Sequence, residues 1–236
     1  MGKGYSTFID QLDPTAEKYP HLKIVSENGE KFLQGNLDIV DGEGKQWESY
    51  QVEIKYKKGF PYRFPKVFET SDKIPKIADW HIYNDESCCI DVEPSEIIKC
   101  RDGITIIDFI DHELLPYLFN QTYRRVEGYY VNSGYSHGWV GVYEFYSEKL
   151  ETDNDMRKTL ALMHYIANND RLNRSNKCFC GSDNLFRNCH MQAFDELKKL
   201  GRAFLLEQIK SLYELSGIKK YDRIKRDHNM ITSTNF

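Results

Sequence analysis

The spacing of apolar residues along the chain changes from helical to alternating and then back to helical. Near the N-terminus, Phe8, Ile9 and Leu12 recur at helical spacing. This spacing predicts a helix within residues 5–19, which Pro14 interrupts or restarts.

The next segment has the pattern of an antiparallel sheet. Apolar residues alternate with polar ones, which is the period of strands with one buried face. The alternating positions are Leu37, Ile39, Val52, Ile54 and Tyr56. Two turn signals, Asn28-Gly29 and Asp41-Gly42, separate the segments. We therefore predict a meander of short antiparallel strands between about residues 22 and 56.

A long irregular stretch follows the predicted sheet. Pro61 and Pro65 exclude a helix and favour extended chain between them. Residues 70–103 show little periodicity and predict a large loop. A loop of this length in a compact domain usually carries a function.

Helical spacing returns in residues 104–126, where Thr105 is a suitable N-cap and Pro116 is expected to kink or end the helix. Further helices are predicted at about residues 155–167 and 192–215. The polar tail, residues 219–236, is expected to fray.

Composition narrows the class of protein. The 236 residues are enough for one full domain with a small annex, or for two small domains. With 32 Lys and Arg against 36 Asp and Glu, the net charge of −4 argues against a nucleic-acid partner. The apolar runs are far shorter than the ~20 residues of a membrane span, and no secretory signal is visible. We therefore expect a cytoplasmic protein without a membrane partner.

The six cysteines form two groups, and disulfides are not expected in this compartment. The first group lies in the middle of the chain and comprises Cys88, Cys89 and Cys100. The second group comprises Cys178, Cys180 and Cys189, and His190 follows it directly. The different spacings indicate two different tasks.

Two motifs around the first group resemble the ubiquitin-conjugating enzyme (UBC) family. The segment FPYRFPKV, residues 60–67, has the length and both key prolines of the family's Tyr-Pro-Phe-x-Pro-Pro-x-Val strand exit. The segment WHIYNDESCCID, residues 80–91, follows the order of the family's His-Pro-Asn motif, turn and active cysteine before Leu-Asp. The chain is also similar here to bacterial members in which the His-Pro-Asn signature is eroded. The resemblance covers about residues 1–148.

The resemblance implies an α+β fold, with a UBC-like antiparallel meander sheet flanked by helices. It also implies that Cys89 carries an acyl group as a thioester and yields it to an amine. His81 would then support the loop, and Asp85 or Asp91 would orient or deprotonate the incoming lysine. Tyr83 departs from the family because it stands where an asparagine normally stabilises the oxyanion.

Several alternatives stay open at this level. Cys88 and Cys89 could be small buried hydrophobic residues, the commonest role of a free cysteine. Cys100 and Cys88 are alternative nucleophiles. The departure at Tyr83 favours a non-catalytic UBC-like module that binds a protein tail. A cysteine hydrolase would use Cys89 with His137 as its general base, although a histidine between glycines is more often part of a turn.

The second cysteine group has the spacing of a zinc site. Cys-x-Cys, eight residues and then Cys-His offer four soft or borderline ligands for tetrahedral Zn²⁺. The segment strongly resembles the SEC-C motif, a small zinc knuckle found on many bacterial proteins. Four protein ligands close the site, so we expect the zinc to be structural.

These assignments predict four regions. They are a UBC-like domain at 1–148, a helical connector at 149–176, the zinc knuckle at 177–192, and a C-terminal helix and tail at 193–236. Bacterial proteins of this kind typically belong to antiphage systems such as CBASS. The resemblance therefore implies that the carried C-terminus belongs to a CD-NTase (a cyclic-oligonucleotide synthase) or to a ubiquitin-like modifier. The chain shows no ATP-binding motif, so any activating enzyme would be a separate partner.

Overall fold

A computed structural model describes residues 2–131 and 134–217, so the tail predicted to fray lies outside the described residues. The chain divides into two compact units. The first unit comprises Met1–Asp91 and Lys99–His137, and the second comprises Val92–Ile98 and Gly138–Phe236. The four region boundaries predicted from the sequence stay predictions.

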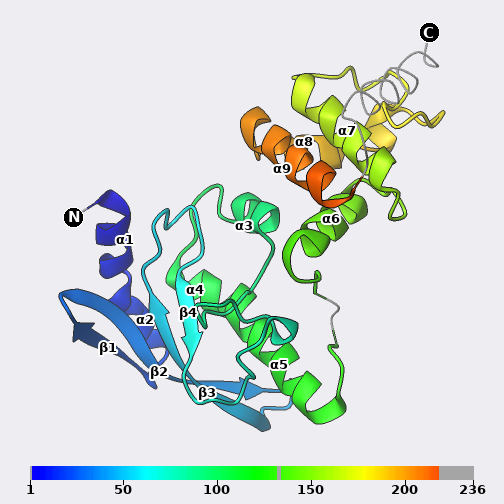
Figure 1. The fold of residues 1–236 in the computed structure, drawn as a ribbon. Helices are drawn as coiled ribbons and strands as arrows, with labels where there is room; N and C mark the ends of the chain where they lie inside the picture. Colours follow the sequence, from blue (N-terminus) through cyan, green and yellow to red (C-terminus); the bar gives the residue numbers. More distant parts are fainter. Residues whose placement is uncertain (1, 132–133, 218–236) are drawn as a thin grey trace. The chain divides into compact units, whose positions relative to one another are not determined.

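The first unit contains a four-stranded antiparallel sheet with the strand order β1-β2-β3-β4 (Figure 1). Its strands are β1 (Leu22–Glu27), β2 (Glu30–Val40), β3 (Gln46–Lys55) and β4 (Lys66–Glu69). Asn28 and Gly29 connect β1 to β2 with φ angles of 51° and 81°, as a tight hairpin turn requires. The α+β class and the antiparallel meander are thus confirmed.

Helices cover the sheet and complete the core of this unit. They are α1 (Lys3–Asp10), α2 (Leu12–Lys18), α4 (Ile106–Phe109), η2 (Ile110–Leu114) and α5 (Leu115–Glu127), with a short 3₁₀ helix, η1 (Ala78–Trp80). Helix α5 contacts β2 and β3. Four of the five predicted alternating positions are buried in one core with helix residues such as Phe8, Phe109 and Leu118. The fifth, Tyr56, follows β3 and is only partly buried. This burial of apolar side chains is the main force that holds the helices on the sheet.

The helix predicted for residues 104–126 forms, but Pro116 does not end it. Thr105 caps its start by accepting a hydrogen bond from the backbone N–H of Asp108 at 3.0 Å. One π-helical segment, η2, comes just before the proline, where the N–H of Leu115 hydrogen bonds to the carbonyl of Ile110. The wider turn lets the chain remain helical across a residue that lacks an N–H group.

The second unit is helical. It contains α3 (Glu93–Lys99, of which residues 93–98 belong to this unit), α6 (Gly138–Lys149), α7 (Met156–Asn168), η3 (Phe186–Asn188), α8 (Met191–Lys198) and α9 (Arg202–Leu215). Helix α7 confirms the helix predicted at 155–167, and the Asp155 carboxylate accepts hydrogen bonds from two N–H groups at its start. Helices α7 and α9 pack against each other.

Three helical assignments in this unit correct the sequence-based picture. Helix α3 lies within residues 70–103, which were predicted to be irregular. Helix α6 occupies a glycine-rich segment to which no element was assigned. The single helix predicted at 192–215 is two helices, because Gly201 adopts a φ of 82° that breaks the helical path.

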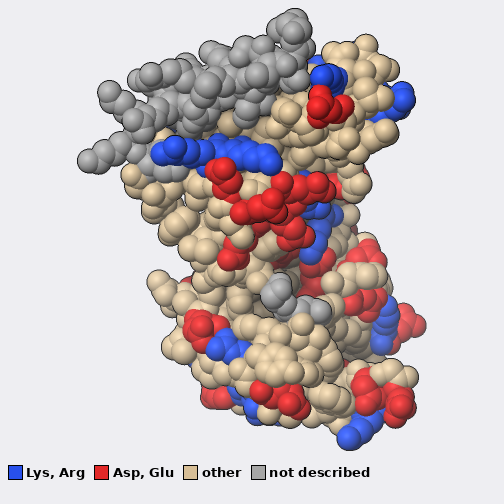
Figure 2. Space-filling view, turned by 90° about the vertical axis from the view of Figure 1, so that its right-hand side faces the viewer, with Lys and Arg blue, Asp and Glu red and all other residues tan. Residues whose placement is uncertain are grey.

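The surface shows no sign of a single dominant charge in the view of Figure 2, where acidic and basic side chains lie interspersed over the described residues. Among the described residues, none of the helices combines the length and the apolar character that crossing a membrane requires.

Candidate functional site

The backbone around Cys89 forms a narrow hairpin beside strand β4. Ile82 and Cys88 pair as an isolated antiparallel bridge, and the N–H of Cys88 donates to the Val67 carbonyl at 2.8 Å. The next N–H, that of Cys89, donates to the carbonyl of His81 at 2.7 Å. Cys89 therefore leaves the hairpin at a fixed distance from His81.

The structure brings a second histidine to this point. The ligand atoms of His81, Cys89 and His137 all lie within 4.8 Å of one another, and all three residues are partly buried. The two imidazole rings stack with centroids 4.7 Å apart and planes inclined by 23°. His137, whose base role was left open by the sequence, thus lies at the cysteine.

The surroundings keep both imidazoles uncharged. Burial, followed by the nearby His137 and Arg124, lowers the pKa of His81 to about 4. Burial also lowers the pKa of His137 below its usual 6.5, and the carboxylate of Asp79 opposes this shift only in part. A neutral imidazole can accept a proton, but a pKa of about 4 makes His81 a weak acceptor for the proton of a thiol, so His137 is the better base of the two. The Nε2 atom of His137 is buried and has no hydrogen-bond partner among the described residues.

Helix α5 holds the turn that carries His81. The Tyr117 hydroxyl donates to the His81 carbonyl at 3.1 Å, and the amide of Gln121 donates to the Trp80 carbonyl at 3.1 Å. The Arg124 guanidinium donates to the Asp79 carbonyl. Residues 117, 121 and 124 lie on one face of a helix. Three successive side chains on this face therefore hold three successive carbonyls, an arrangement we call the carbonyl clamp.

The clamp supports an unusual backbone conformation. His81 lies in the left-handed region with a φ of 53°, which is strained for a residue with a side chain. Its carbonyl accepts hydrogen bonds from both Tyr117 and the Cys89 N–H. These contacts offset the strain and fix the direction in which the imidazole leaves the backbone.

Arg124 has further contacts around the same turn. Its guanidinium pairs with the Asp79 carboxylate and donates to the Tyr130 hydroxyl at 2.9 Å. It also lies over the rings of Trp80 and Tyr130, at 4.2 Å and 4.7 Å from their centroids. The Tyr130 ring in turn lies edge-on to His81, with centroids 5.4 Å apart.

The two alternative nucleophiles lie in the interior. Cys100 is fully buried and Cys88 is 7% exposed, both within the hydrophobic core. Burial raises the pKa of the Cys88 thiol to about 12. Neither thiol has the surroundings of a reactive cysteine.

The predicted carboxylates both form ion pairs with lysines. Asp85 lies 2.5 Å from the Lys66 ammonium and accepts hydrogen bonds from the N–H and hydroxyl of Ser87. Lys66, followed by Ser87, lowers the pKa of Asp85 to about 2. Asp91 lies 2.8 Å from Lys99. Tyr83 is 49% exposed and lies edge-on to His137, with ring centroids 6.3 Å apart.

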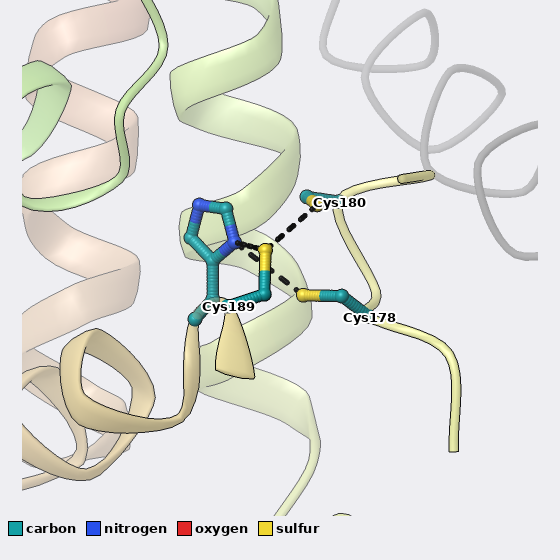
Figure 3. Close-up of side chains that lie close together, drawn as sticks. Cys178, Cys180 and Cys189 are labelled. Carbon is teal, nitrogen blue, oxygen red and sulfur yellow. Dashed lines mark hydrogen bonds between the residues drawn. The ribbon is translucent and has the colours of Figure 1, made fainter. Parts of the chain in front are cut away.

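The second site is the predicted knuckle, and the sulfurs of Cys178, Cys180 and Cys189 point toward one another (Figure 3). The ligand atoms of these cysteines and His190 lie within 4.8 Å of one another. The Cys180 and Cys189 sulfurs are 3.7 Å apart, close to the roughly 3.8 Å edge of a tetrahedron with Zn–S bonds of about 2.3 Å. The four residues can therefore hold a metal ion.

The local chain explains how these ligands meet. An antiparallel bridge joins Lys177 to Leu185, so that the segment turns back on itself through Gly181, which has a φ of 85°. His190 directs Nδ1 at the sulfurs of Cys189 and Cys178, at 3.0 Å and 3.4 Å. Burial by itself raises the pKa of Cys180, but hydrogen bonding with Ser182 outweighs it and lowers the pKa to about 7. A thiol that ionises easily favours metal binding.

Aromatic rings form a small core beneath the knuckle. Phe179 stacks on Tyr165 of α7, with ring centroids 4.7 Å apart and planes 3° apart. It also meets Phe186 and Phe194 at centroid distances of 6.0 Å. The knuckle is thereby fastened to α7 and α8.

The chain matches no protein-family model, no curated protein and no solved structure.

Sequence reasoning missed Asp79 and the three clamp residues. The helical spacing of 117, 121 and 124 was readable in the predicted helix, but nothing in the sequence shows which loop that face contacts. In contrast, the knuckle ligands lie within 13 residues, so their spacing alone predicted the cluster that the structure contains.

Proposed function

We propose that this protein is a cysteine-dependent acyltransferase that carries the C-terminus of another protein as a thioester on Cys89 and transfers it to an amine. The observation that carries this proposal is the group of a partly buried thiol and two uncharged imidazoles within 4.8 Å. A thiol beside a proton acceptor is the common arrangement of cysteine nucleophiles.

In the first step, the Cys89 sulfur attacks the carbonyl carbon of an activated C-terminus, either an acyl thioester or an acyl adenylate. The S–C bond forms, and the donor's thiolate or AMP leaves with the bonding electron pair. The thiol proton passes to an imidazole, which gives it to the leaving group or to solvent and is neutral again before the second step. His137 is the better acceptor, because its Nε2 has no hydrogen-bond partner among the described residues.

In the second step, an amine attacks the thioester carbonyl. The C–N bond forms, the C–S bond breaks, and the Cys89 thiolate is released to be protonated again. The amine loses its extra proton to an imidazole. The carbonyl clamp holds His81 and Cys89 in fixed positions during both steps. This lowers the conformational entropy that is lost on reaching the transition state.

The motif resemblance supports a more specific proposal for the carried protein, the cellular role and the metal. A UBC-like protein with an eroded His-Pro-Asn signature would accept the tail of a ubiquitin-like modifier or a CD-NTase, in the cytoplasm of a bacterium that uses it in antiviral defence. A separate activating enzyme would supply the activated tail. The knuckle, with the spacing of an SEC-C motif, would hold a structural Zn²⁺ through Cys178, Cys180, Cys189 and His190.

A second candidate function is a cysteine hydrolase that releases such conjugates. The specific observation in its favour is the position of His137 at Cys89, together with the Asp79 carboxylate that acts on His137 electrostatically. The first step is the same, but water replaces the amine as the acceptor. The two functions therefore differ only in the second step.

The test uses a fluorescent peptide with a C-terminal glycine thioester as the acyl donor. The wild-type protein is expected to form a thiol-sensitive adduct on a non-reducing gel, and Cys89→Ala is expected to form none. Cys100→Ala is the matched control and should form the adduct. His137→Ala should form it about 10²–10⁴ times more slowly.

The group that finally accepts the peptide then distinguishes the acyltransferase from the hydrolase. Transfer of the peptide to added lysine supports the acyltransferase, whereas release of free peptide acid without amine transfer supports the hydrolase. An adduct that persists in Cys89→Ala and disappears in Cys100→Ala would refute the assignment of the nucleophile. A protein that forms no adduct would act as a binding module instead.

A further inference from the structure

We propose that His81, Cys89 and His137 form a second metal site, which binds a thiophilic divalent cation such as Zn²⁺ and thereby blocks the nucleophile. The effect on acyl transfer rests on the proposed function, but the binding itself does not.

The donor set suits such a cation. One thiolate sulfur and two imidazole nitrogens are ligands that Zn²⁺ and Co²⁺ favour. The three ligand atoms lie within 4.8 Å of one another, the same limit that the four knuckle ligands meet. A shared ion at about 2.0–2.3 Å from each donor would draw these atoms closer together than that limit.

One imidazole nitrogen at this site is an unsatisfied polar atom. The Nε2 atom of His137 is buried and lacks a hydrogen-bond partner among the described residues. Buried polar atoms in folded proteins almost always have a partner. A bound cation would be a partner for Nε2 of His137. If the other ring nitrogen bound the cation, the ring would turn and Nε2 would reach a new hydrogen-bond partner.

The backbones of two of the ligands are held rigidly. The 2.7 Å hydrogen bond from the Cys89 N–H to the His81 carbonyl fixes their backbones, and Tyr117 holds the same carbonyl. Ligands that are held in place lose little freedom when they bind an ion. The rings of His81 and His137 are 23° from parallel, so one of them must rotate to aim its lone pair at a shared ion.

This site differs from the knuckle in its number of ligands. The knuckle offers four protein ligands and is closed, whereas the Cys89 site offers three and leaves one position for water or an anion. We therefore expect the Cys89 site to release its ion more easily than the knuckle does. Because the metal and the acyl group use the same sulfur, each excludes the other.

Metal content after dialysis against micromolar ZnCl₂ tests the binding. The wild-type chain should hold two zinc ions, by elemental analysis and native mass spectrometry. Cys89→Ser and His137→Ala should each hold only one and bind the second at least about tenfold more weakly. His112→Ala, which removes an exposed histidine elsewhere in the first unit, is the matched control and should still hold two.

A second measurement needs no variant. Zn²⁺ should slow the alkylation of Cys89 by iodoacetamide in the unmodified protein, and a weak chelator should restore it while the knuckle keeps its ion. One zinc per wild-type chain, or two in Cys89→Ser, would overturn the proposal. Zinc binding without any thioester would instead leave this site standing and refute the proposed function.

Discussion

The Nε2 atom of His190 lies 2.8 Å from the carbonyl oxygen of Leu150, forty residues earlier in the chain. Nε2 therefore carries the proton and donates it to this carbonyl, which leaves Nδ1 unprotonated and directed at the sulfurs of Cys178 and Cys189. A backbone acceptor on the second nitrogen is the usual support of a metal-binding histidine. The contact also joins the knuckle to the end of helix α6.

Zinc removal is expected to destabilise the second unit. Cys178→Ser breaks the tetrahedral ligand set, and the short segment around it has little core beyond its aromatic rings. We expect the loss of one zinc ion and a decrease of more than about 3 kcal/mol in the free energy of unfolding of this unit. Urea denaturation followed by circular dichroism, with zinc analysis, measures both.

Lys177→Ala is the matched control for that experiment. Lys177 precedes Cys178 and pairs with Asp183, but both side chains are exposed and neither is a ligand. This variant should keep its zinc and its stability. Equal stability and zinc content in Cys178→Ser would contradict a structural metal site.

Brief alkylation should label Cys89 well before the other cysteines of the first unit. A thiol with a pKa of about 12, such as Cys88, is almost entirely protonated at pH 8, and both Cys88 and Cys100 are shielded from the reagent. Peptide mapping after iodoacetamide treatment of the native, chelator-washed protein measures the three rates. Labelling of Cys100 as fast as that of Cys89 would show that the core opens readily or that the site is misassigned.

Loss of the carbonyl clamp should alter the reactivity of Cys89 at a distance. Arg124→Met keeps most of the side-chain volume but removes the guanidinium that donates to the Asp79 carbonyl and pairs with the Asp79 carboxylate. We expect a destabilisation of about 1–3 kcal/mol and an alkylation rate of Cys89 that differs at least severalfold from the wild type.

The neighbouring residue provides the control for the clamp. Arg125→Met removes an ion pair with Glu48 but no contact of the clamp. It should change stability without changing the alkylation rate of Cys89. If both variants change that rate equally, the effect arises from general loosening of α5 and not from the clamp.

Stability should decrease at low pH through Glu48. Burial by itself raises the pKa of this carboxyl, but hydrogen bonds with Lys73, Ser49 and Arg125 outweigh it and lower the pKa to about 2, from 4.5. Because the folded-state pKa is the lower one, the contribution is complete above about pH 4.5 and is lost as the pH falls toward 2.

Glu48→Gln tests this assignment. The variant should be less stable than the wild type at pH 7 by about 1–3 kcal/mol, and the difference should shrink below pH 4.5. Urea denaturation at a series of pH values measures it. If the difference in the free energy of unfolding does not depend on pH, the effect arises from packing and not from the charge of Glu48.

Local features were readable from the sequence. The Asn28-Gly29 turn, the cap at Thr105 and the alternation within the strands depend on residues near one another in the chain. The knuckle belongs to the same class, because its ligands are close in sequence and one tight turn brings them together. Pro116 does not end its helix, because a π turn before it accommodates the missing N–H, and the break at Gly201 was missed because its φ becomes evident only in the structure.

Only the tertiary structure decided which histidine meets Cys89 and what holds His81 in place. Cys89 was readable as a candidate, but so were Cys88 and Cys100, and burial is a property of the folded chain. The clamp brings residues 79–81 against the face of α5 that begins at Tyr117, and His137 arrives from a still later segment. The spacing of residues predicts contacts along one element or one turn, whereas contacts between distant segments depend on how the whole core packs.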